Sequence, residues 1–199
     1  MVNLDAKFKD AMWIAKSLFE RGKVTGSSAN MSFLHEGNIY ITGSGTCFGN
    51  LTEKDFSVVN INGEHIGGIQ PSKEFSLHKT YYEKDTSIKA VIHTHSFYST
   101  LWSCLIHENV KDVIPPYTPY LKMKLGTVGL IPYAKPGSQL LFDLFAEHVN
   151  DCDGYILQNH GPVVGDKNLM SAFYCLEELE ESARIAWELR KENVDIIKE

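Results

Sequence analysis

Apolar residues recur every three or four positions in several stretches of the chain, which is typical of helices with one buried face. The first such stretch covers residues 4–19, where Asn3 is placed to cap the start and Gly22 to end the helix. The last stretch follows Asn168, another residue suited to capping. The pattern predicts helices over residues 4–19, 72–84, about 97–106, 137–149 and 169–189.

Shorter apolar or alternating runs lie between these helices and predict strands. Residues 30–34 and 38–42 flank the turn His35-Glu36-Gly37, so they are expected to form a hairpin. Further strands are predicted over residues 56–60, 90–95, 128–132 and 155–160. Because helices alternate with hairpin-like strands, we expect an α/β fold with three α/β/α layers around a mainly antiparallel sheet. No linker or repeat divides the chain, so residues 1–199 are expected to form a single domain.

Composition and charge narrow the class of protein. The net charge of −6 over 199 residues gives no electrostatic reason to expect nucleic acid or an anionic membrane as a partner. The chain holds no apolar run of about 18 residues, and its first residues do not resemble a signal peptide. Its four cysteines are scattered without a CxxC pair, which favours reduced thiols and a cytoplasmic protein.

Three histidines stand at the ends of apolar strands and form the candidate metal site. His93 and His95 are two positions apart, and side chains at that spacing share one face of a strand. His160 ends the strand predicted at 155–160. Three imidazoles with one open position are the usual arrangement of a catalytic zinc. Each piece alone is weak, because a His-x-His pair is more often two ordinary hydrogen-bonded histidines.

Proton transfer beside such a metal needs a carboxylate, and Glu74 is the candidate. A lone glutamate in a first helical turn is more often a favourable partner of the helix dipole. His78 lies one helical turn after Glu74, so it either supports the site from behind or is simply packed. The order and spacing of all these pieces favour the catalytic interpretation over the structural one.

Several short segments together resemble the class II aldolase/adducin family over nearly the whole chain. They are Gly26-Ser27-Ser28-Ala29-Asn30-Met31-Ser32, Ile41-Thr42-Gly43-Ser44-Gly45, Pro71-Ser72-Lys73-Glu74, His93-Thr94-His95-Ser96 and Asn159-His160-Gly161. The resemblance implies that His93, His95 and His160 bind Zn²⁺ or another divalent metal. It also implies that Glu74 is a ligand at rest and the acid/base in turnover. It further implies a homotetramer with sites between neighbouring subunits.

Other segments resemble the members of this family that decarboxylate 3-oxo-tetronate 4-phosphates. One is the lysine at position 73, where fuculose-phosphate aldolases have a second serine, and the others are residues 118–120, 132–137, 159–164 and 177–181. Two positions depart from the family: Ala29, where glycine is usual, and Gly43, where the turn usually reads Thr-Pro-Thr-Gly. By resemblance to a similarly placed tyrosine in the aldolases, Tyr120 is expected to be a second proton donor. The residues expected around the phosphate are Asn30, Ser44, Gly45, Ser72 and Lys73.

The resemblance implies an enzyme that takes a small phosphorylated sugar acid. We expect a zinc-dependent carbon–carbon lyase that releases carbon dioxide and dihydroxyacetone phosphate through a metal-stabilised enediolate. An aldolase of the fuculose-1-phosphate type would form the same intermediate, so it remains an alternative, as does a pentulose-phosphate 4-epimerase. An alternative of another class is a non-catalytic binding module like the adducin head.

Overall fold

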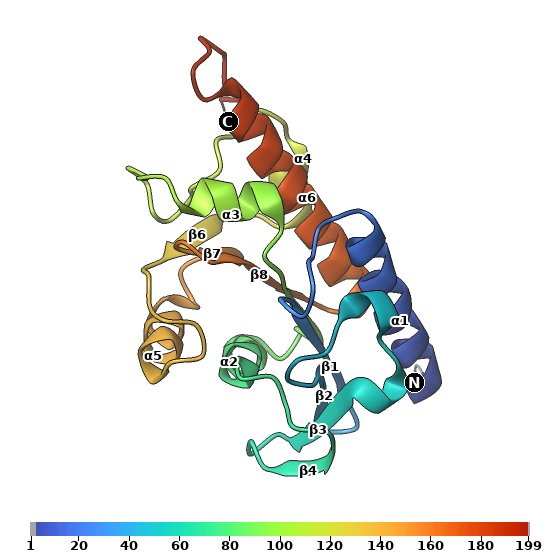
Figure 1. Cartoon of the computed structure of the whole chain (residues 1–199). Coiled ribbons are helices and arrows are strands. Elements are labelled where there is room, and N and C mark those ends of the chain that lie inside the picture. Colours follow the sequence, from blue (N-terminus) through green and yellow to red (C-terminus); the bar gives the residue numbers. More distant parts are fainter. Residues whose placement is uncertain (1–2, 199) are drawn as a thin grey trace.

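The computed structural model describes residues 3–198, and its strands form one eight-stranded sheet (Figure 1). The strands lie in the order β4-β3-β2-β1-β5-β8-β7-β6. The β6–β7 pair is parallel, and every other neighbouring pair among the described residues is antiparallel. The strands are β1 (Asn30–His35), β2 (Asn38–Thr42), β3 (Phe56–Asn60), β4 (His65–Gly68), β5 (Ala90–His93), β6 (Val128–Ile131), β7 (Gly154–Leu157) and β8 (Gly161–Asp166).

Helices cover both faces of this sheet, which confirms the three-layer α/β/α arrangement (Figure 1). One face carries α1 (Leu4–Glu20), α3 (Phe97–Ser103), α4 (Tyr120–Lys124) and α6 (Leu169–Leu189). The other face carries α2 (Phe75–Lys84) and α5 (Gln139–His148). Two short 3-10 helices, η1 (Phe48–Asn50) and η2 (Glu53–Asp55), precede β3.

Side-chain alternation along the strands divides the interior into two cores. Ala90 and Ile92 of β5 pack with α1, α3 and α6, whereas Val91 between them packs with α2 and α5. In β7, Ile156 belongs to the first core, and Tyr155 and Leu157 belong to the second. Strands that are buried on both faces are rich in apolar residues, which explains the continuous apolar runs at residues 90–92 of β5 and 155–157 of β7.

The predicted elements all exist, but several boundaries were wrong. The helix predicted from residue 72 begins at Phe75, because residues 71–74 form a bridge and a turn. The strand predicted to residue 95 ends at His93. The strand predicted to residue 160 ends at Leu157, because the chain turns and returns as β8. Three elements were not predicted from the sequence: β8, which starts with the turn-like pair Gly-Pro, and the short elements β4 and α4.

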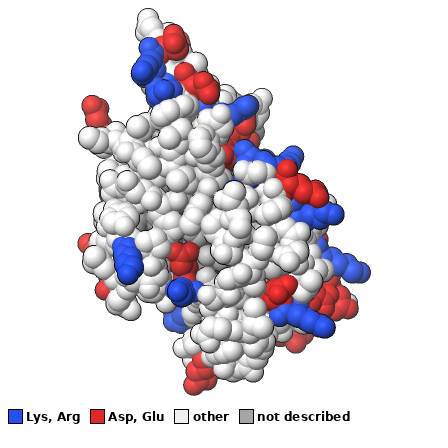
Figure 2. Space-filling view, in the orientation of Figure 1, with Lys and Arg blue, Asp and Glu red and all other residues white. Residues whose placement is uncertain are grey.

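Charged side chains are unevenly distributed over the surface. On the face in Figure 2, lysine, arginine and carboxylate groups gather along the margin where α1 and α6 lie, and the centre is largely uncharged. Among residues 3–198, no helix has both the length and the apolar character that crossing a membrane requires.

Candidate metal centre

The three predicted histidines meet at one end of the sheet. His93 is the last residue of β5, His95 follows two positions later, and His160 lies in the turn between β7 and β8. Ring centroids are 5.2 Å apart for His93 and His95, 4.8 Å for His93 and His160, and 4.7 Å for His95 and His160. One nitrogen from each ring lies within 4.8 Å of the others, so the group could hold a metal ion.

The backbone fixes the orientation of the His93 ring. Its Nδ1 lies 2.8 Å from the carbonyl oxygen of Pro162. A carbonyl oxygen can only accept, so Nδ1 carries the proton and Nε2 keeps its lone pair. That free nitrogen faces Nε2 of His160 at 3.3 Å. A histidine held from behind in this way is typical of a metal ligand.

Glu74 brings a carboxylate to the three histidines from the layer of α2 and α5. It is the N-cap of α2 and is buried. Its Oε2 lies 3.3 Å from Nε2 of His93, and its Oε1 lies 3.5 Å from Nε2 of His160. The carboxylate therefore faces the same small space as the imidazoles.

The separations between these atoms fit a shared cation. Nitrogen and oxygen ligands about 2.0–2.2 Å from one tetrahedral ion lie roughly 3.3–3.5 Å from each other. The His93–His160 and Glu74 separations of 3.3, 3.3 and 3.5 Å match that spacing. Oε1 of Glu74 and Nδ1 of His160 are also buried without a hydrogen-bond partner, although buried polar atoms are nearly always paired. The donor set and the unpaired carboxylate oxygen both fit a divalent metal.

Burial keeps the imidazoles neutral, as metal ligands must be. Burial, together with the charge of His95, lowers the pKa of His93 to about 3. Burial and the neighbouring His93 lower the pKa of His160 to about 3. Burial also lowers the pKa of His95, although the negative charge of Glu74 opposes that shift.

A buried chain of hydrogen bonds supports Glu74 from behind. The amide nitrogen of Asn30 lies 2.9 Å from Glu74 Oε2, and the amide oxygen of Asn30 lies 2.5 Å from Nε2 of His78. Nδ1 of His78 lies 2.7 Å from the hydroxyl of Ser32, which is 2.6 Å from that of Tyr82. Since the Asn30 oxygen accepts, His78 donates from Nε2 and accepts from Ser32 at Nδ1. The polarity of the chain therefore runs from Tyr82 towards Glu74.

Local backbone features explain the segment around His160. Asn159 adopts a left-handed conformation with φ of 55°, which asparagine tolerates better than most residues. A Cβ on Gly161 would lie 2.3 Å from the carbonyl oxygen of Thr94 and 3.2 Å from Cα of His95. Glycine is therefore needed where β8 passes the backbone between the two other histidines.

A cavity of about 350 Å³ opens beside the metal group. Its lining includes His95, His160 and Glu74. All five residues expected around the phosphate also line it: Asn30, Ser44, Gly45, Ser72 and Lys73. The structure thus brings both predicted groups of residues to one cavity.

The two departures from the family pattern lie at this cavity. Ala29 and Gly43 both line it. A Cβ on Gly43 would lie 2.2 Å from Cδ1 of Ile69, so a larger residue there would displace the side chain of Ile69. Gly43 also forms an isolated β-bridge with Pro71, which holds the two sides of the cavity together.

Tyr120 is not among the residues that line the cavity. It starts α4 and is 59% exposed, so its predicted role stays a prediction. Four further lining residues were not predicted to be part of the site: Ser27, Ser28, Pro136 and Gly137. Ser27 and Ser28 adjoin Asn30 in the sequence, which was the available signal. Nothing local in the sequence shows that the loop of Pro136 reaches the cavity.

Comparison with known proteins agrees with this geometry. Residues 9–187 match the family described as "Class II Aldolase and Adducin N-terminal domain". The chain is 43% identical over 173 residues to 3-oxo-tetronate 4-phosphate decarboxylase of Escherichia coli, covering 86% of this chain and 82% of the relative. It is 38% identical over 175 residues to L-fuculose phosphate aldolase of Methanococcus maripaludis, covering 86% and 91%.

A solved structure matches the whole architecture. The crystal structure of YgbL from Klebsiella pneumoniae, described as an aldolase, epimerase or decarboxylase, superposes with a TM-score of 0.95 at 36% identity. The match covers 100% of this chain and 96% of that one.

Proposed function

The chain belongs to the class II aldolase and adducin family, and we propose that it decarboxylates a 3-oxo-tetronate 4-phosphate to dihydroxyacetone phosphate and carbon dioxide. It is a lyase, as its named enzyme relatives are. The observation that carries the proposal is the meeting of His93, His160 and Glu74 beside a cavity lined with serine, glycine and lysine. Relatives that are 42–43% identical to this chain over 173 residues are named 3-oxo-tetronate 4-phosphate decarboxylase.

We propose Zn²⁺ as the metal, held by His93, His95 and His160 with Glu74 as the fourth ligand at rest. Imidazole nitrogens suit zinc, and no cysteine lies in the group. A divalent cation there would act as a Lewis acid for the substrate's carbonyl and neighbouring hydroxyl.

Glu74 is the residue that handles the proton. Loss of carbon dioxide leaves an electron pair on the carbon next to the carbonyl, and the resulting enediolate must take a proton at that carbon. Glu74 borders the cavity and has one buried oxygen without a hydrogen-bond partner. The other oxygen accepts a hydrogen bond from the side-chain amide of Asn30 at 2.9 Å, so the orientation of the carboxylate does not depend on a bound cation. These contacts suit a general acid and base that works in one fixed place.

The serine- and glycine-rich side of the cavity is proposed to take the substrate's phosphate. Gly45 has φ of 79°, a conformation that lets a turn aim its backbone N–H groups at an anion. Lys73 is exposed at the rim and supplies a positive charge. Ser44 and Ser72 add hydroxyl donors. We propose that Asn30 contributes little to phosphate binding, because its side-chain amide already forms hydrogen bonds with Glu74 and His78.

We propose that the protein is a homotetramer in which Tyr120 of one subunit completes the site of its neighbour. Tyr120 lies outside the cavity of its own subunit and is exposed. The largely uncharged centre of the face in Figure 2 is suited to burial in an interface. The cytoplasmic location and the single domain over residues 1–199 stay predictions from the sequence.

An aldolase remains the second candidate, because relatives named L-fuculose phosphate aldolase share 34–38% of the sequence. The test is to incubate zinc-loaded protein with a 3-oxo-tetronate 4-phosphate and, separately, with a ketose 1-phosphate. We expect dihydroxyacetone phosphate and carbon dioxide in equal amounts from the first substrate. Release of an aldehyde from the second, with no carbon dioxide from the first, would favour the aldolase. Epimerisation of a pentulose 5-phosphate would favour the epimerase, and failure to bind zinc would favour the adducin-like module.

A further inference from the structure

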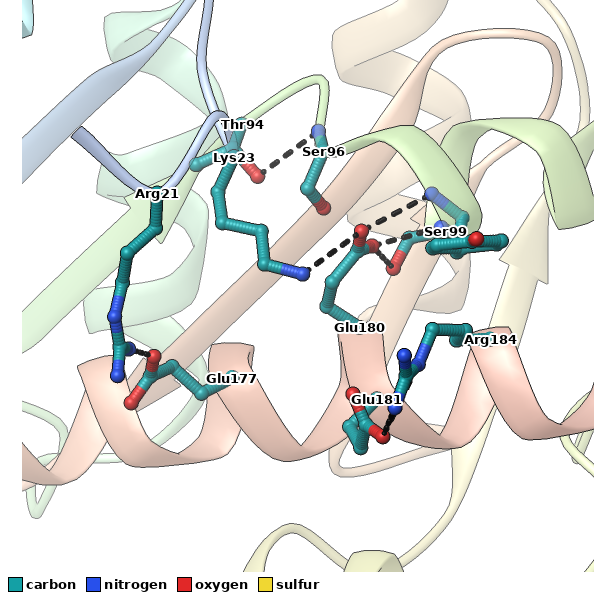
Figure 3. A network of polar contacts seen from close by, with 10 residues as sticks. Arg21, Lys23, Thr94, Ser96, Ser99, Glu177, Glu180, Glu181 and Arg184 are labelled. Atoms are coloured by element: carbon teal, nitrogen blue, oxygen red, sulfur yellow. Dashed lines mark hydrogen bonds and ion pairs between the residues drawn. The ribbon is translucent and has the colours of Figure 1, made fainter. Parts of the chain in front are cut away.

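Glu180 is a buried carboxylate on α6 that contacts none of the three histidines. It is 2% exposed. Its Oε2 accepts hydrogen bonds from the backbone N–H and the hydroxyl of Ser99, at 2.9 and 2.8 Å. Its Oε1 accepts from the backbone N–H of Tyr98 at 3.1 Å and lies 3.5 Å from Nζ of Lys23 (Figure 3). Four donors thus offset the cost of burying this charge.

These bonds cap α3 from another helix. The first N–H groups of any helix lack partners within the helix. Ser96 occupies the N-cap of α3, but its side chain makes no capping bond and its hydroxyl is buried without a partner. Glu180 supplies the acceptors instead, so the start of α3 is fixed relative to α6 rather than by its own sequence.

The position of α3 determines where two of the metal-binding histidines lie. His95 comes directly before Ser96, the N-cap of the helix. One turn later, the hydroxyl of Thr100 donates to the carbonyl oxygen of His160 at 3.2 Å. The carbonyl of Ser103 accepts from the backbone N–H of Asn159 at 3.3 Å. The same short helix therefore holds the segments that carry His95 and His160.

Lys23 extends this arrangement to the other side of the cavity. It follows α1 and precedes residues 27–30, which line the cavity. Its ammonium group approaches the carboxylate of Glu180, which lies between Lys23 and the start of α3 (Figure 3). The carboxylate of Glu180 is thus in contact with the segments that lead to both the metal side and the phosphate side.

We propose that Glu180 is a positioning residue of the metal centre, which sets the spacing of His95 and His160 by anchoring α3. The inference rests on the proposed function in one respect, namely that the imidazoles hold a metal. A purely structural role would give a different result, because loss of packing lowers the melting temperature without changing the ligand geometry of a protein that still folds.

The test compares Glu180→Gln with Glu177→Gln in the full chain. Glutamine keeps the size of the side chain, but its NH₂ end cannot accept from the N–H groups of α3. Glu177 is a matched control on the same helix, since it pairs with Arg21 (Figure 3). The readouts are Zn²⁺ affinity, by competition with a chromophoric chelator, and the visible spectrum of the Co²⁺-substituted protein.

We expect Glu180→Gln to weaken Zn²⁺ binding by about 10- to 100-fold and to shift the Co²⁺ bands, with Glu177→Gln like the wild type. A wild-type affinity and spectrum in Glu180→Gln would overturn the inference and leave the proposed function standing. A wild-type protein that binds no zinc would overturn both. If Glu180→Gln does not fold, Ser99→Ala removes one donor from the carboxylate. It should then weaken Zn²⁺ binding about threefold or more, and unchanged binding would overturn the inference.

Discussion

The side-chain amide of Asn30 donates a 2.9 Å hydrogen bond to Oε2 of Glu74. The two residues are 44 positions apart in the chain and come from adjacent layers, β1 of the sheet and the N-cap of α2. Asn30 also pairs with His93 across the β1–β5 register, so one strand position contacts both the proposed base and a proposed metal ligand. The resemblance to the family led us to expect Asn30 at the phosphate, whereas its contacts serve the carboxylate.

Asn30→Ala removes the hydrogen bond that holds Glu74. We expect kcat to fall about 10- to 100-fold, because outer partners of a metal site have effects of that size. KM should change less, since the phosphate side of the cavity keeps its other residues. Steady-state kinetics check this, with Asn50→Ala as the control at an exposed site. If kcat falls equally in both variants, Asn30 has no specific role in holding Glu74.

Glu74→Gln tests the proton-transfer role directly. The fold and much of the metal affinity should survive, because the three imidazoles remain. Turnover should fall by a factor on the order of 100 to 10,000, the usual contribution of a positioned acid or base. Kinetics and zinc content measured on the same preparation separate the two effects. A turnover close to that of the wild type would show that another residue handles the proton.

Gly161→Ala introduces a Cβ 2.3 Å from the carbonyl oxygen of Thr94. We expect the free energy of unfolding to fall by about 1–3 kcal/mol, as in other overpacked sites. Zinc affinity should fall as well, because the displaced backbone carries His95. Urea titration and zinc competition measure the two effects. Gly67→Ala is the matched control, since its Cβ would meet nothing closer than 3.9 Å, and it should leave zinc affinity unchanged.

The metal-free protein should lose stability as the pH falls from about 6.5 to about 3, in part because of His78. Burial, with His93 adding to it, lowers the pKa of His78 to about 3 in the folded protein. In that window the unfolded chain binds a proton that the folded protein does not, so the free energy of unfolding decreases as pH falls. The slope from one such histidine is at most about 1.4 kcal/mol per pH unit.

Urea titrations of the metal-free protein at pH 7 and pH 4.5 measure the effect of His78. His78→Gln keeps groups that can accept from Ser32 and donate to Asn30, but it cannot take up the proton. Its stability should therefore change less between the two pH values than that of the wild type. His65→Gln replaces an exposed histidine and should keep the wild-type dependence. A wild-type dependence in His78→Gln would contradict the assignment.

Lys73→Met removes the positive charge at the cavity rim. We expect KM for the phosphorylated substrate to rise about tenfold, with zinc affinity unchanged, because the ammonium group of Lys73 forms no hydrogen bond or ion pair with a proposed metal ligand in the described part of the chain. Lys79→Met is the control. Lys79 lies on α2, six residues after Lys73, and forms an ion pair with Glu83. Inhibition by inorganic phosphate should weaken in parallel with KM in the Lys73 variant alone. If KM and inhibition by phosphate both stay at the wild-type value, Lys73 does not bind phosphate.

The sequence predicted the layers and the members of the metal group because both follow local patterns. Apolar runs identified β5 and β7. Histidines that follow such runs are expected to lie at the end of the sheet. The prediction that His93 and His95 share one face of a strand was only partly right, since β5 ends at His93 and His95 lies in the loop that follows. His95 still lies close to His93 and His160, because β8 and α3 hold the loop that carries His95.

The contacts that support the site could not be predicted in the same way. His78 reaches Ser32 and Asn30 only through the placement of α2 against β1. Glu180 belongs to the run Glu177-Glu178-Leu179-Glu180-Glu181, which looks like an exposed acidic helix face in sequence. Only the packing of α3 against α6 distinguishes the buried Glu180 from the half-buried glutamates beside it. The proposed role of Tyr120 depends on the proposed homotetramer, so the fold of one chain does not test it.

The central claim is that His93, His95 and His160 hold one divalent cation next to Glu74. Anomalous diffraction at the zinc absorption edge, from crystals of the zinc-loaded protein, tests it most directly. The account predicts one strong peak per chain, about 2.0–2.1 Å from a ring nitrogen of each of the three histidines. A peak elsewhere, or none at this place in protein supplied with excess zinc, would contradict it.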